Sequence, residues 1–261
     1  MKTSCLNLLV IFMVKRPIHR LYDGSTVPEY DELADESIIT IMNKKKVVVR
    51  LLATPQDLID LAVGHVRCEG RGTVNSVVVN GTEITVIGDV IPRPVDDLLT
   101  AACGACTSGE ISTPVAIIER TQILSADIKE MMTNMKKSQP IFDSTGGVHA
   151  ATVFKQSGDC VVTREDIGRH NAFDKAVGAS MNMNFEPKII GLSGRVGWEL
   201  IAKAIRTNIE IVIAIGAISS AAEALARNAG ITIVGFALRE NPVLVGPLSR
   251  IIDKQNATRA E

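Results

Sequence analysis

Apolar, β-branched runs that alternate with polar turns divide the first part of the chain into two predicted hairpins. Ser37–Met42 and Val47–Leu52 lie on either side of a short polar, lysine-rich stretch, which is the pattern of two strands and a turn. Val74–Val79 and Glu83–Ile87 lie on either side of Asn80-Gly81, the dipeptide most typical of a tight hairpin turn. We therefore expect a β-rich region before residue 100.

Two helices are predicted around these hairpins from their start signals. Thr54-Pro55 precedes apolar residues at helical spacing, so we expect Thr54 to be the N-cap and the helix to end before Gly70. Ser125 precedes a second periodic stretch with three methionines, which we interpret as core-filling residues. The segment Lys136–Pro140 then looks like a link between two parts of the chain.

The second half of the chain alternates between short apolar strands and helical patterns. The predicted strands are Ile189–Leu192, Glu210–Ile215 and Ile231–Phe236, and the predicted helices between them are Trp198–Thr207 and Ala221–Asn228. This alternation is typical of an α/β fold in which parallel strands are joined by right-handed helical crossovers. We expect an N-terminal α+β region over residues 1–125 and an α/β region over residues 126–261.

Ligands of such sheets bind beyond the carboxyl ends of the strands. In this sequence those ends carry Ser193-Gly194-Arg195, Gly216–Ser220 and Ala237-Leu238-Arg239. Small and cationic residues are therefore expected to gather at one edge of the sheet.

Composition and charge exclude several classes of protein. The 261 residues have a formal net charge of -1 and only 3% aromatic residues, so neither a basic field nor stacking platforms for nucleic acid are expected. The apolar run Leu6–Val14 is too short to span a bilayer and lacks a signal-peptide cleavage site. We expect it to be an N-terminal strand or to precede a working start at Met13, so that residues 1–12 need not be native. No membrane association is expected.

Only one pair of cysteines lies close in sequence, Cys103-Gly104-Ala105-Cys106. The odd total of five cysteines does not fit a secreted disulfide framework, so a reducing, cytoplasmic location is expected. The pair could form a disulfide, hold a metal or provide a nucleophilic thiolate. Zinc is a serious alternative, with Cys103, Cys106 and His149 as ligands. A zinc deaminase also needs a glutamate beside its histidine, and Ala150-Ala151 follows His149 here.

Three glycine-marked segments could bind an anion. Gly146-Gly147 precedes His149, Arg169-His170 follows Gly168 at a predicted helix start, and Ser193-Gly194-Arg195 follows a strand. Free N–H groups at a helix start and a nearby guanidinium favour phosphate. The alternative for the second segment is a solvated, self-paired helix start with Asp166 as its cap, and the alternative for the first is a tight turn with a satisfied histidine.

Taken together, these segments resemble the formate dehydrogenase accessory sulfurtransferases of the FdhD/NarQ type. The matching motifs occur in order over nearly the whole chain: Thr54-Pro55, Asp57-Leu58, Asp60-Leu61, Gly64, Glu69-Gly70, Cys103-Gly104-Ala105-Cys106, Thr145-Gly146-Gly147-Val148-His149-Ala150-Ala151, Glu165-Asp166-Ile167-Gly168-Arg169-His170-Asn171-Ala172, Asp174-Lys175, Ser193-Gly194-Arg195 and Gly235-Phe236-Ala237. The run from Glu165 to Asn171 is the most specific of them.

The resemblance implies a fold, a reaction and a set of partners. The fold would be a cytidine deaminase-like, three-layer arrangement of helices on a sheet. The protein would be a sulfurtransferase that carries a cysteine persulfide from a cysteine desulfurase to the molybdenum or tungsten bis(pterin guanine dinucleotide) cofactor needed by formate dehydrogenase. A non-catalytic cofactor-binding chaperone and a zinc-dependent, deaminase-like hydrolase are the alternatives, and a homodimer is plausible for the family.

By the same resemblance, Cys103 would carry the persulfide and Cys106 would be a relay or resolving thiol. No tightly bound metal of the protein's own is expected. The expected cofactor-binding residues are the family's C-terminal stretch together with the three anion-binding candidates: Phe236, Ala237, Leu238, Arg239, Glu240, Asn241, Gly146, Gly147, His149, Arg169, His170, Ser193, Gly194 and Arg195.

Overall fold

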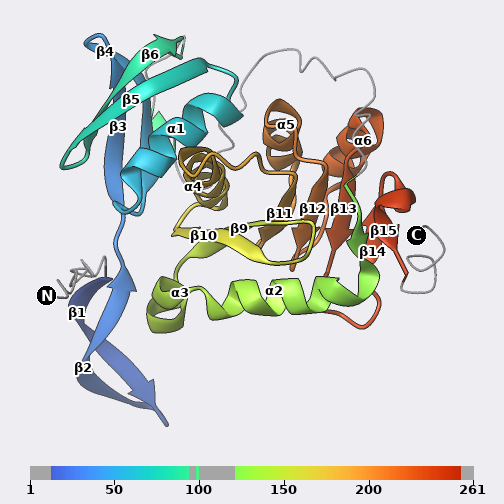
Figure 1. The fold of residues 1–261 in the computed structure, drawn as a ribbon. Helices are drawn as coiled ribbons and strands as arrows, with labels where there is room; N and C mark the ends of the chain where they lie inside the picture. The colour runs from blue at the N-terminus through green and yellow to red at the C-terminus, as the bar shows by residue number, and fades with distance from the viewer. Residues whose placement is uncertain (1–12, 94–97, 100–120, 254–261) are drawn as a thin grey trace, which may run out of the picture.

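The computed structural model describes residues 13–93, 98–99 and 121–253. Within these ranges the strands form a six-stranded and a five-stranded sheet, together with two sheets of two strands each. Helices lie on both faces of the larger sheet, and the smaller sheet lies beyond one of these helices (Figure 1). The predicted α/β class is confirmed.

The larger sheet has a parallel centre and antiparallel margins. Strands β11, β12 and β13 are parallel, as predicted, while β9, β10 and β14 pair in the antiparallel sense, in the order β10-β9-β11-β12-β13-β14. The bounds are β9 His149–Phe154, β10 Cys160–Asp166, β11 Ile189–Leu192, β12 Ile211–Ala214, β13 Thr232–Gly235 and β14 Val243–Val245.

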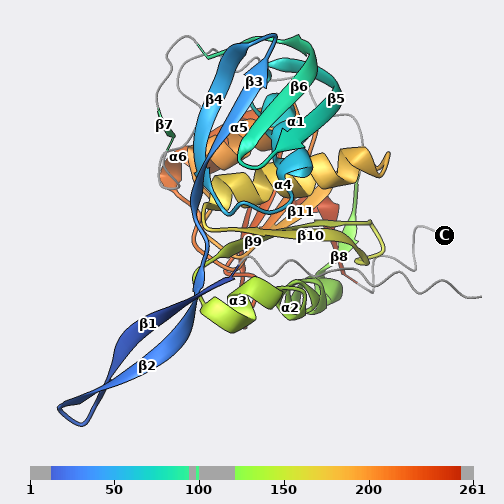
Figure 2. The same cartoon turned by 90° about the vertical axis from the view of Figure 1, so that its left-hand side faces the viewer.

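Because side chains alternate along a strand, the two faces of this sheet have separate cores. Ile213 and Val234 pack on one face against the methionines of α2, whereas Val212 and Ile233 pack on the other face in a cluster with residues of α4, α5 and α6. Helices α2 and α3 therefore cover one face and the other three cover the opposite face (Figures 1 and 2). The bounds are α2 Ile128–Lys137, α3 Pro140–Thr145, α4 Arg169–Asn182, α5 Trp198–Arg206 and α6 Ser220–Ala229.

The smaller sheet and α1 form the N-terminal core. Both predicted hairpins are confirmed as β3–β4 and β5–β6. Ile41, Leu51 and Ile84 are fully or almost fully buried against Leu61 of α1. The bounds are β3 Ser37–Asn43, β4 Lys46–Ala53, α1 Leu58–Cys68, β5 Gly72–Asn80, β6 Glu83–Val90 and β7 Leu98–Leu99.

Helix α1 joins this region to the rest of the protein. It packs against α4 so closely that nearly all of α4 is buried between α1 and the larger sheet. A short parallel pair, β8 (Ile123–Leu124) and β15 (Ile251–Ile252), brings the end of the described chain back to the segment before α2. Short 3₁₀ turns lie at Ser125–Asp127 and Leu248–Arg250.

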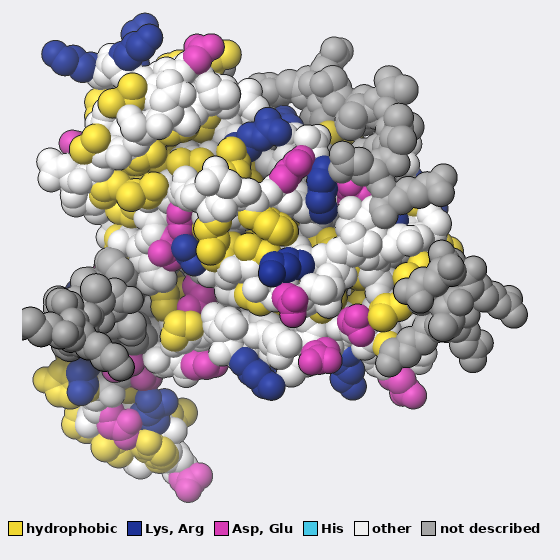
Figure 3. Space-filling model, in the orientation of Figure 1, with side chains coloured by type: hydrophobic (Ala, Val, Ile, Leu, Met, Phe, Trp, Pro, Cys, Tyr) yellow, Lys and Arg dark blue, Asp and Glu magenta, His cyan; other side chains and the backbone are white. Residues whose placement is uncertain are grey.

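A two-stranded ribbon, β1 (Met13–Tyr22) and β2 (Ser25–Ala34), extends away from the body of the protein (Figures 1 and 2). Its turn is Asp23-Gly24, with positive φ at both residues. The ribbon exposes Leu21 and Tyr30 by 70% and 67% of their surface, which leaves apolar side chains on an element that is marginally stable alone (Figure 3). The sequence analysis did not predict this hairpin, although Asp-Gly is a hairpin signal.

Two predicted caps are wrong. The N-cap of α1 is Asp57 rather than Thr54, because Thr54 is fully buried and its hydroxyl accepts a hydrogen bond from the Ile167 N–H at 3.1 Å. Ser125 does not cap α2; its hydroxyl donates to Asp253 at 2.8 Å instead. In both cases the hydroxyl group that would have capped the helix forms a hydrogen bond with a residue far away in the sequence instead.

Candidate functional site

The turns after the parallel strands meet at one edge of the larger sheet. The Gly216 N–H donates to the Gly194 carbonyl at 3.1 Å, and the Phe236 N–H donates to the Gly216 carbonyl at 3.0 Å. A Cβ atom on Gly216 would lie 2.7 Å from the Gly194 oxygen, so only glycine permits this approach of the two backbones. The predicted gathering of these turns is confirmed, and we call this place the carboxyl edge.

His149 stands at the carboxyl edge, at the first position of β9. Its Nδ1 lies 3.5 Å from the Ser193 hydroxyl, whose oxygen accepts a hydrogen bond from the Ala150 N–H at 2.9 Å. Burial lowers the pKa of His149, and the guanidinium groups of Arg169 and Arg195 lower it further. The imidazole is therefore neutral at neutral pH, and its surroundings are electropositive.

Two guanidinium groups at the carboxyl edge have no partner within the described part of the chain. Arg169 begins α4, and its Cβ lies 3.9 Å from the position of a Cβ on Gly194. Arg195 is exposed in the turn after β11. Helix α4 starts at Gly168 without a side-chain cap and without an acidic residue in its first turn. Free N–H groups, a positive helix pole and two cations make this edge receptive to an anion.

The other charged residues of this segment are used inside the protein. Asp166 accepts a hydrogen bond from the Gly168 N–H at 2.8 Å and pairs with the fully buried Lys175 at 2.7 Å. Lys175 also donates to the Thr54 carbonyl at 2.9 Å, and Asn171 donates to the Leu52 carbonyl at 3.0 Å. The self-pairing in the alternative interpretation is confirmed, but the helix start is buried rather than solvated, because these residues clamp α4 to the chain before α1.

His170 lies inward from the carboxyl edge. It is 4% exposed, and neither ring nitrogen has a hydrogen-bond partner among the described residues. Burial lowers the pKa of His170 to about 3, with Lys203 and Arg169 contributing. The ring is therefore neutral at physiological pH and is held below the surface.

The C-terminal stretch divides into a buried and an exposed part. Phe236 has a φ of 53°, and Ala237 is 2% exposed with its N–H donating to the Ala214 carbonyl at 2.9 Å, while Leu238 packs on the α2 side. Arg239, Glu240 and Asn241 are exposed. The Arg239 guanidinium lies 3.8 Å from the centroid of the Phe236 ring, a cation–π contact that orients both side chains.

A cavity of about 420 Å³ adjoins this stretch on the α2 side of the sheet. Ala237, Arg239 and Glu240 line one wall, and Ser125 and Lys129 line the other. Ser125 and Lys129 could not be predicted as lining residues, because they precede the C-terminal stretch by more than a hundred positions and belong to no motif. The cavity extends the carboxyl edge toward β14.

The remaining candidates are only partly placed. Gly146 ends α3 with a φ of +64°, and the Gly147 N–H donates to the Thr145 hydroxyl at 3.1 Å, so the pair forms the turn that leads into His149. Cys103 and Cys106 lie outside the described residues. No cluster of three or more potential metal ligands occurs in the described ranges. In the same ranges, no helix has the length and apolar character needed to cross a bilayer.

The fold and this edge define an α/β protein with a glycine-rich, cationic rim on a mixed sheet. Residues 34–251 match the model of the FdhD/NarQ family. This match covers well over half of the chain, and the chain therefore belongs to the FdhD/NarQ family.

Curated relatives from distant organisms are similar over most of their length. The chain is 31% identical to the sulfur carrier protein FdhD of Streptomyces coelicolor, over 85% of this chain and 89% of the relative. It is 29% identical to the FdhD protein of Sulfolobus acidocaldarius, over 85% and 92% of the two chains. It is 32% identical to the protein of the same name from Nocardia farcinica, over 85% and 88%.

A crystal structure from Desulfotalea psychrophila has the same fold. Its chain, described as a candidate formate dehydrogenase accessory protein, superposes with a TM-score of 0.79 at 22% identity. The superposition covers 93% of this chain and 100% of the other. At this identity the likeness shows the fold alone.

Proposed function

We propose that this protein is a sulfurtransferase that carries persulfide sulfur from a cysteine desulfurase to a molybdenum or tungsten bis(pterin guanine dinucleotide) cofactor destined for formate dehydrogenase. Family membership supports the sulfur-carrier role. The observation that carries the cofactor part is the carboxyl edge, where Arg169 at the start of α4 and the nearby Arg195 have no partner among the described residues. Such an arrangement suits a diphosphate.

The sulfur chemistry falls to the cysteine pair. The Cys103 thiolate attacks the outer sulfur of the donor's persulfide, so that one S–S bond breaks, another forms and the donor thiolate leaves. In the resolving role, Cys106 then attacks the inner sulfur of the Cys103 persulfide. This step forms a Cys103–Cys106 disulfide and releases the outer sulfur as sulfide, which the cofactor metal accepts as a ligand. A cellular dithiol must reduce the disulfide before the next cycle.

The residues of the carboxyl edge fit a guanine dinucleotide as the bound substrate. Arg169, Arg195 and the N–H groups of α4 would hold the diphosphate, and neutral His149 would provide a hydrogen bond without adding charge. The Phe236–Arg239 pair and the neighbouring cavity offer a surface for the flat base. The hydrogen-bond donors of these residues and the cavity of about 420 Å³ beside Arg239 support this mode of binding.

Sulfur loading tests the proposal most directly. After incubation with a cysteine desulfurase and ³⁵S-cysteine, the unaltered chain is expected to retain label that a reducing thiol releases. Cys103→Ala is expected to retain less than about a tenth of it, since only a thiolate can accept the sulfane sulfur. Cys106→Ala is expected to load but to release sulfide poorly.

Two further thiols provide the controls. Cys160 is exposed, so Cys160→Ala should load as well as the unaltered chain. Cys68 is buried and burial raises its pKa well above the ordinary value, so it should stay unlabelled. Full labelling of Cys103→Ala would show that the persulfide assignment is wrong, and guanine-nucleotide binding without any labelling would favour the chaperone alternative.

Guanosine diphosphate binding tests the cofactor site separately. Arg169→Ala and Arg195→Ala are each expected to weaken binding about 10-fold or more, because each removes a charge-assisted hydrogen bond worth roughly 1.5–3 kcal/mol. Isothermal titration calorimetry measures the change. Arg227→Ala is the matched control, since Arg227 pairs with Glu223 on the exposed face of α6. Equal affinities of the unaltered chain and the three variants would show that the carboxyl edge does not bind the cofactor.

The partners and location follow from this role. We propose that a desulfurase, formate dehydrogenase and a second copy of this chain bind the protein, and that it works in the cytoplasm, where thiols stay reduced. The apolar side chains exposed on the ribbon β1–β2 support an additional protein contact. Light scattering tests the homodimer, and a monomer at micromolar concentration would argue against it. The cytidine deaminase-like description of the fold stays a prediction.

A further inference from the structure

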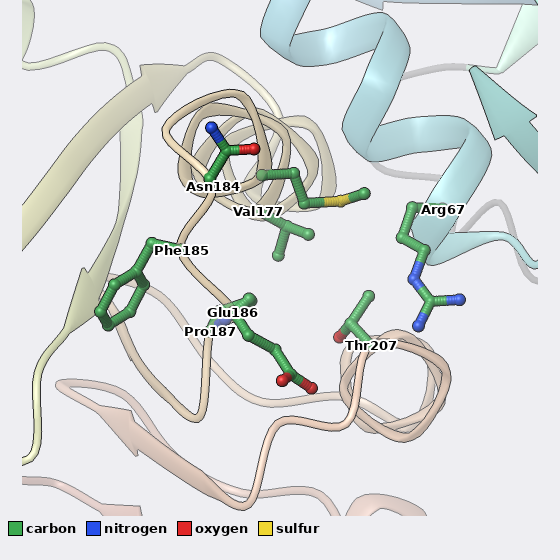
Figure 4. Close-up of a pocket in the computed structure, with 8 residues that line it drawn as sticks. Arg67, Val177, Asn184, Phe185, Glu186, Pro187 and Thr207 are labelled. Carbon is green, nitrogen blue, oxygen red and sulfur yellow. The ribbon is translucent and has the colours of Figure 1, made fainter. Parts of the chain in front are cut away.

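A second cavity, of about 380 Å³, lies at the opposite end of the larger sheet from the carboxyl edge. Helices α1, α4 and α5 end around it, and β11 begins just after its floor. Figure 4 shows Arg67 on one side, Phe185 on the other, and Val177 between them on α4. The apolar lining residues are Val177, Met181, Phe185 and Pro187, and the polar ones are Arg67, Asn184, Glu186 and Thr207.

Arg67 is the unusual member of this lining. It is only partly exposed, and within the described part of the chain no hydrogen bond or ion pair engages its guanidinium. A position in the last turn of α1 gives it a favourable interaction with the helix pole, but this leaves its N–H donors without acceptors. A partly buried guanidinium beside apolar walls favours a ligand that brings an anion.

Two of the other polar groups of the cavity are already engaged. Glu186 pairs with Lys188 at 3.1 Å, and the Thr207 hydroxyl donates to the Lys203 carbonyl at 2.8 Å. The Asn184 amide is exposed at the rim. The cavity therefore has an apolar body with one unengaged cation, which is the usual make-up of a site for a small amphipathic ligand.

We propose that this cavity binds a small monocarboxylate with an apolar body about the size of a phenyl group, its carboxylate on Arg67 and its apolar part against Met181 and Phe185. The site is independent of the proposed sulfur carriage and of the carboxyl edge. The three helix ends place partial negative charge near the ligand and weaken its binding, so an affinity in the millimolar range is expected for a simple probe.

The probe is 4-phenylbutyrate, observed through the methyl groups of ¹³C-labelled methionine. A saturable shift of the Met181 methyl resonance is expected with the acid, and at least a 10-fold weaker effect is expected with its amide. Arg67→Gln should weaken acid binding about 10-fold while keeping the packing of the side-chain stem. Arg67→Lys should keep part of the affinity, because it restores the charge but not the bidentate geometry.

Three controls make the result decisive. Cys103→Ala and Arg227→Ala should bind the probe as the unaltered chain does, which separates this site from the sulfur chemistry and from surface charge. An acetylated peptide that ends in phenylalanine distinguishes a free acid from a protein C-terminus, and tighter binding of the peptide would overturn the small-acid assignment. Equal binding of acid and amide, or undiminished binding by Arg67→Gln, would overturn the site itself.

Discussion

Replacing Lys203 with methionine is expected to lower the free energy of unfolding by about 3–5 kcal/mol, the range for breaking a buried ion pair from one side. The Lys203 ammonium is fully buried and lies 2.7 Å from both oxygens of Asp174 and 2.9 Å from Glu69. Methionine fills a similar volume, so the loss measures mainly the burial of Asp174 and Glu69 without the Lys203 ammonium, with Arg206 still 4.0 Å from Glu69. Urea unfolding followed by circular dichroism measures it.

The size of this effect comes from the position of the ion-pair cluster that Lys203 forms with Asp174 and Glu69. Glu69 follows α1, Asp174 lies on α4 and Lys203 lies on α5, so one ammonium joins three helices. His65 of α1 adds a contact from its Nδ1 to Asp174 at 3.1 Å. The same helices hold the N-terminal region against the larger sheet, and loss of the cation therefore weakens the contact between the two cores.

The loss should depend on pH in a defined direction. Burial alone would raise the pKa of Asp174, but Lys203 and His65 overcome it and hold the pKa at about 2. In the intact protein this contribution is present above the ordinary value of 3.8 and is lost as the pH falls toward 2. Without Lys203 the largest influence that lowers the pKa of Asp174 is lost while its burial remains, so the folded-state pKa rises and the ionised carboxylate contributes less to stability. The deficit of Lys203→Met should therefore be largest at neutral pH and shrink on acidification.

Two further variants check the origin of the loss. Lys203→Met combined with Asp174→Asn should recover part of the stability at neutral pH, because one uncompensated charge is removed. Lys136→Met, at an exposed position of α2, should change stability by no more than about 0.5 kcal/mol. A deficit for Lys203→Met that is as large at pH 3 as at pH 7 would contradict the electrostatic explanation.

The sequence predicted those parts of the fold that local pattern controls. The β-branched runs around Asn80-Gly81 and the alternation of strands and helices after residue 188 identified the sheets, because hairpin turns and buried strands are specified by neighbouring residues. The gathering of Gly194 and Gly216 at one edge also followed, since the carboxyl ends of parallel strands share an edge. The family motifs indicated the class of protein from the sequence alone.

Other features depend on partners far away in the sequence and could not be read locally. The pattern around Asp166 suggested a solvated helix start as one interpretation, yet Asp166 and Lys175 pair inside the protein, where Lys175 reaches the backbone of Thr54, 121 positions away. His170 looked like a phosphate ligand and is buried instead. Charged residues near a glycine have the same sequence pattern in an anion-binding site and in a buried ion-pair network. Only the packing of the folded protein distinguishes the two.

The second large effect is expected where α1 and α4 cross. A Cβ atom on Gly178 would lie 1.9 Å from the backbone oxygen of Asp60, and one on Gly64 would lie 1.8 Å from that of Asp174. These are backbone contacts, so no side chain can move aside and the helices must separate. Gly178→Ala is therefore expected to cost about 3 kcal/mol or more, at or beyond the upper end for overpacked cores.

The sign of this result is diagnostic, because alanine is the better helix former by about 1 kcal/mol and would stabilise α4 if the space were open. Ala224→Ser adds one heavy atom on the exposed face of α6 and should cost only about 0.5 kcal/mol. Thermal and urea unfolding compare the two variants. A Gly178→Ala protein as stable as the parent would mean that the helices cross less closely than described. A loss would show that the two helices cross as closely as described and that this crossing holds α4 against α1.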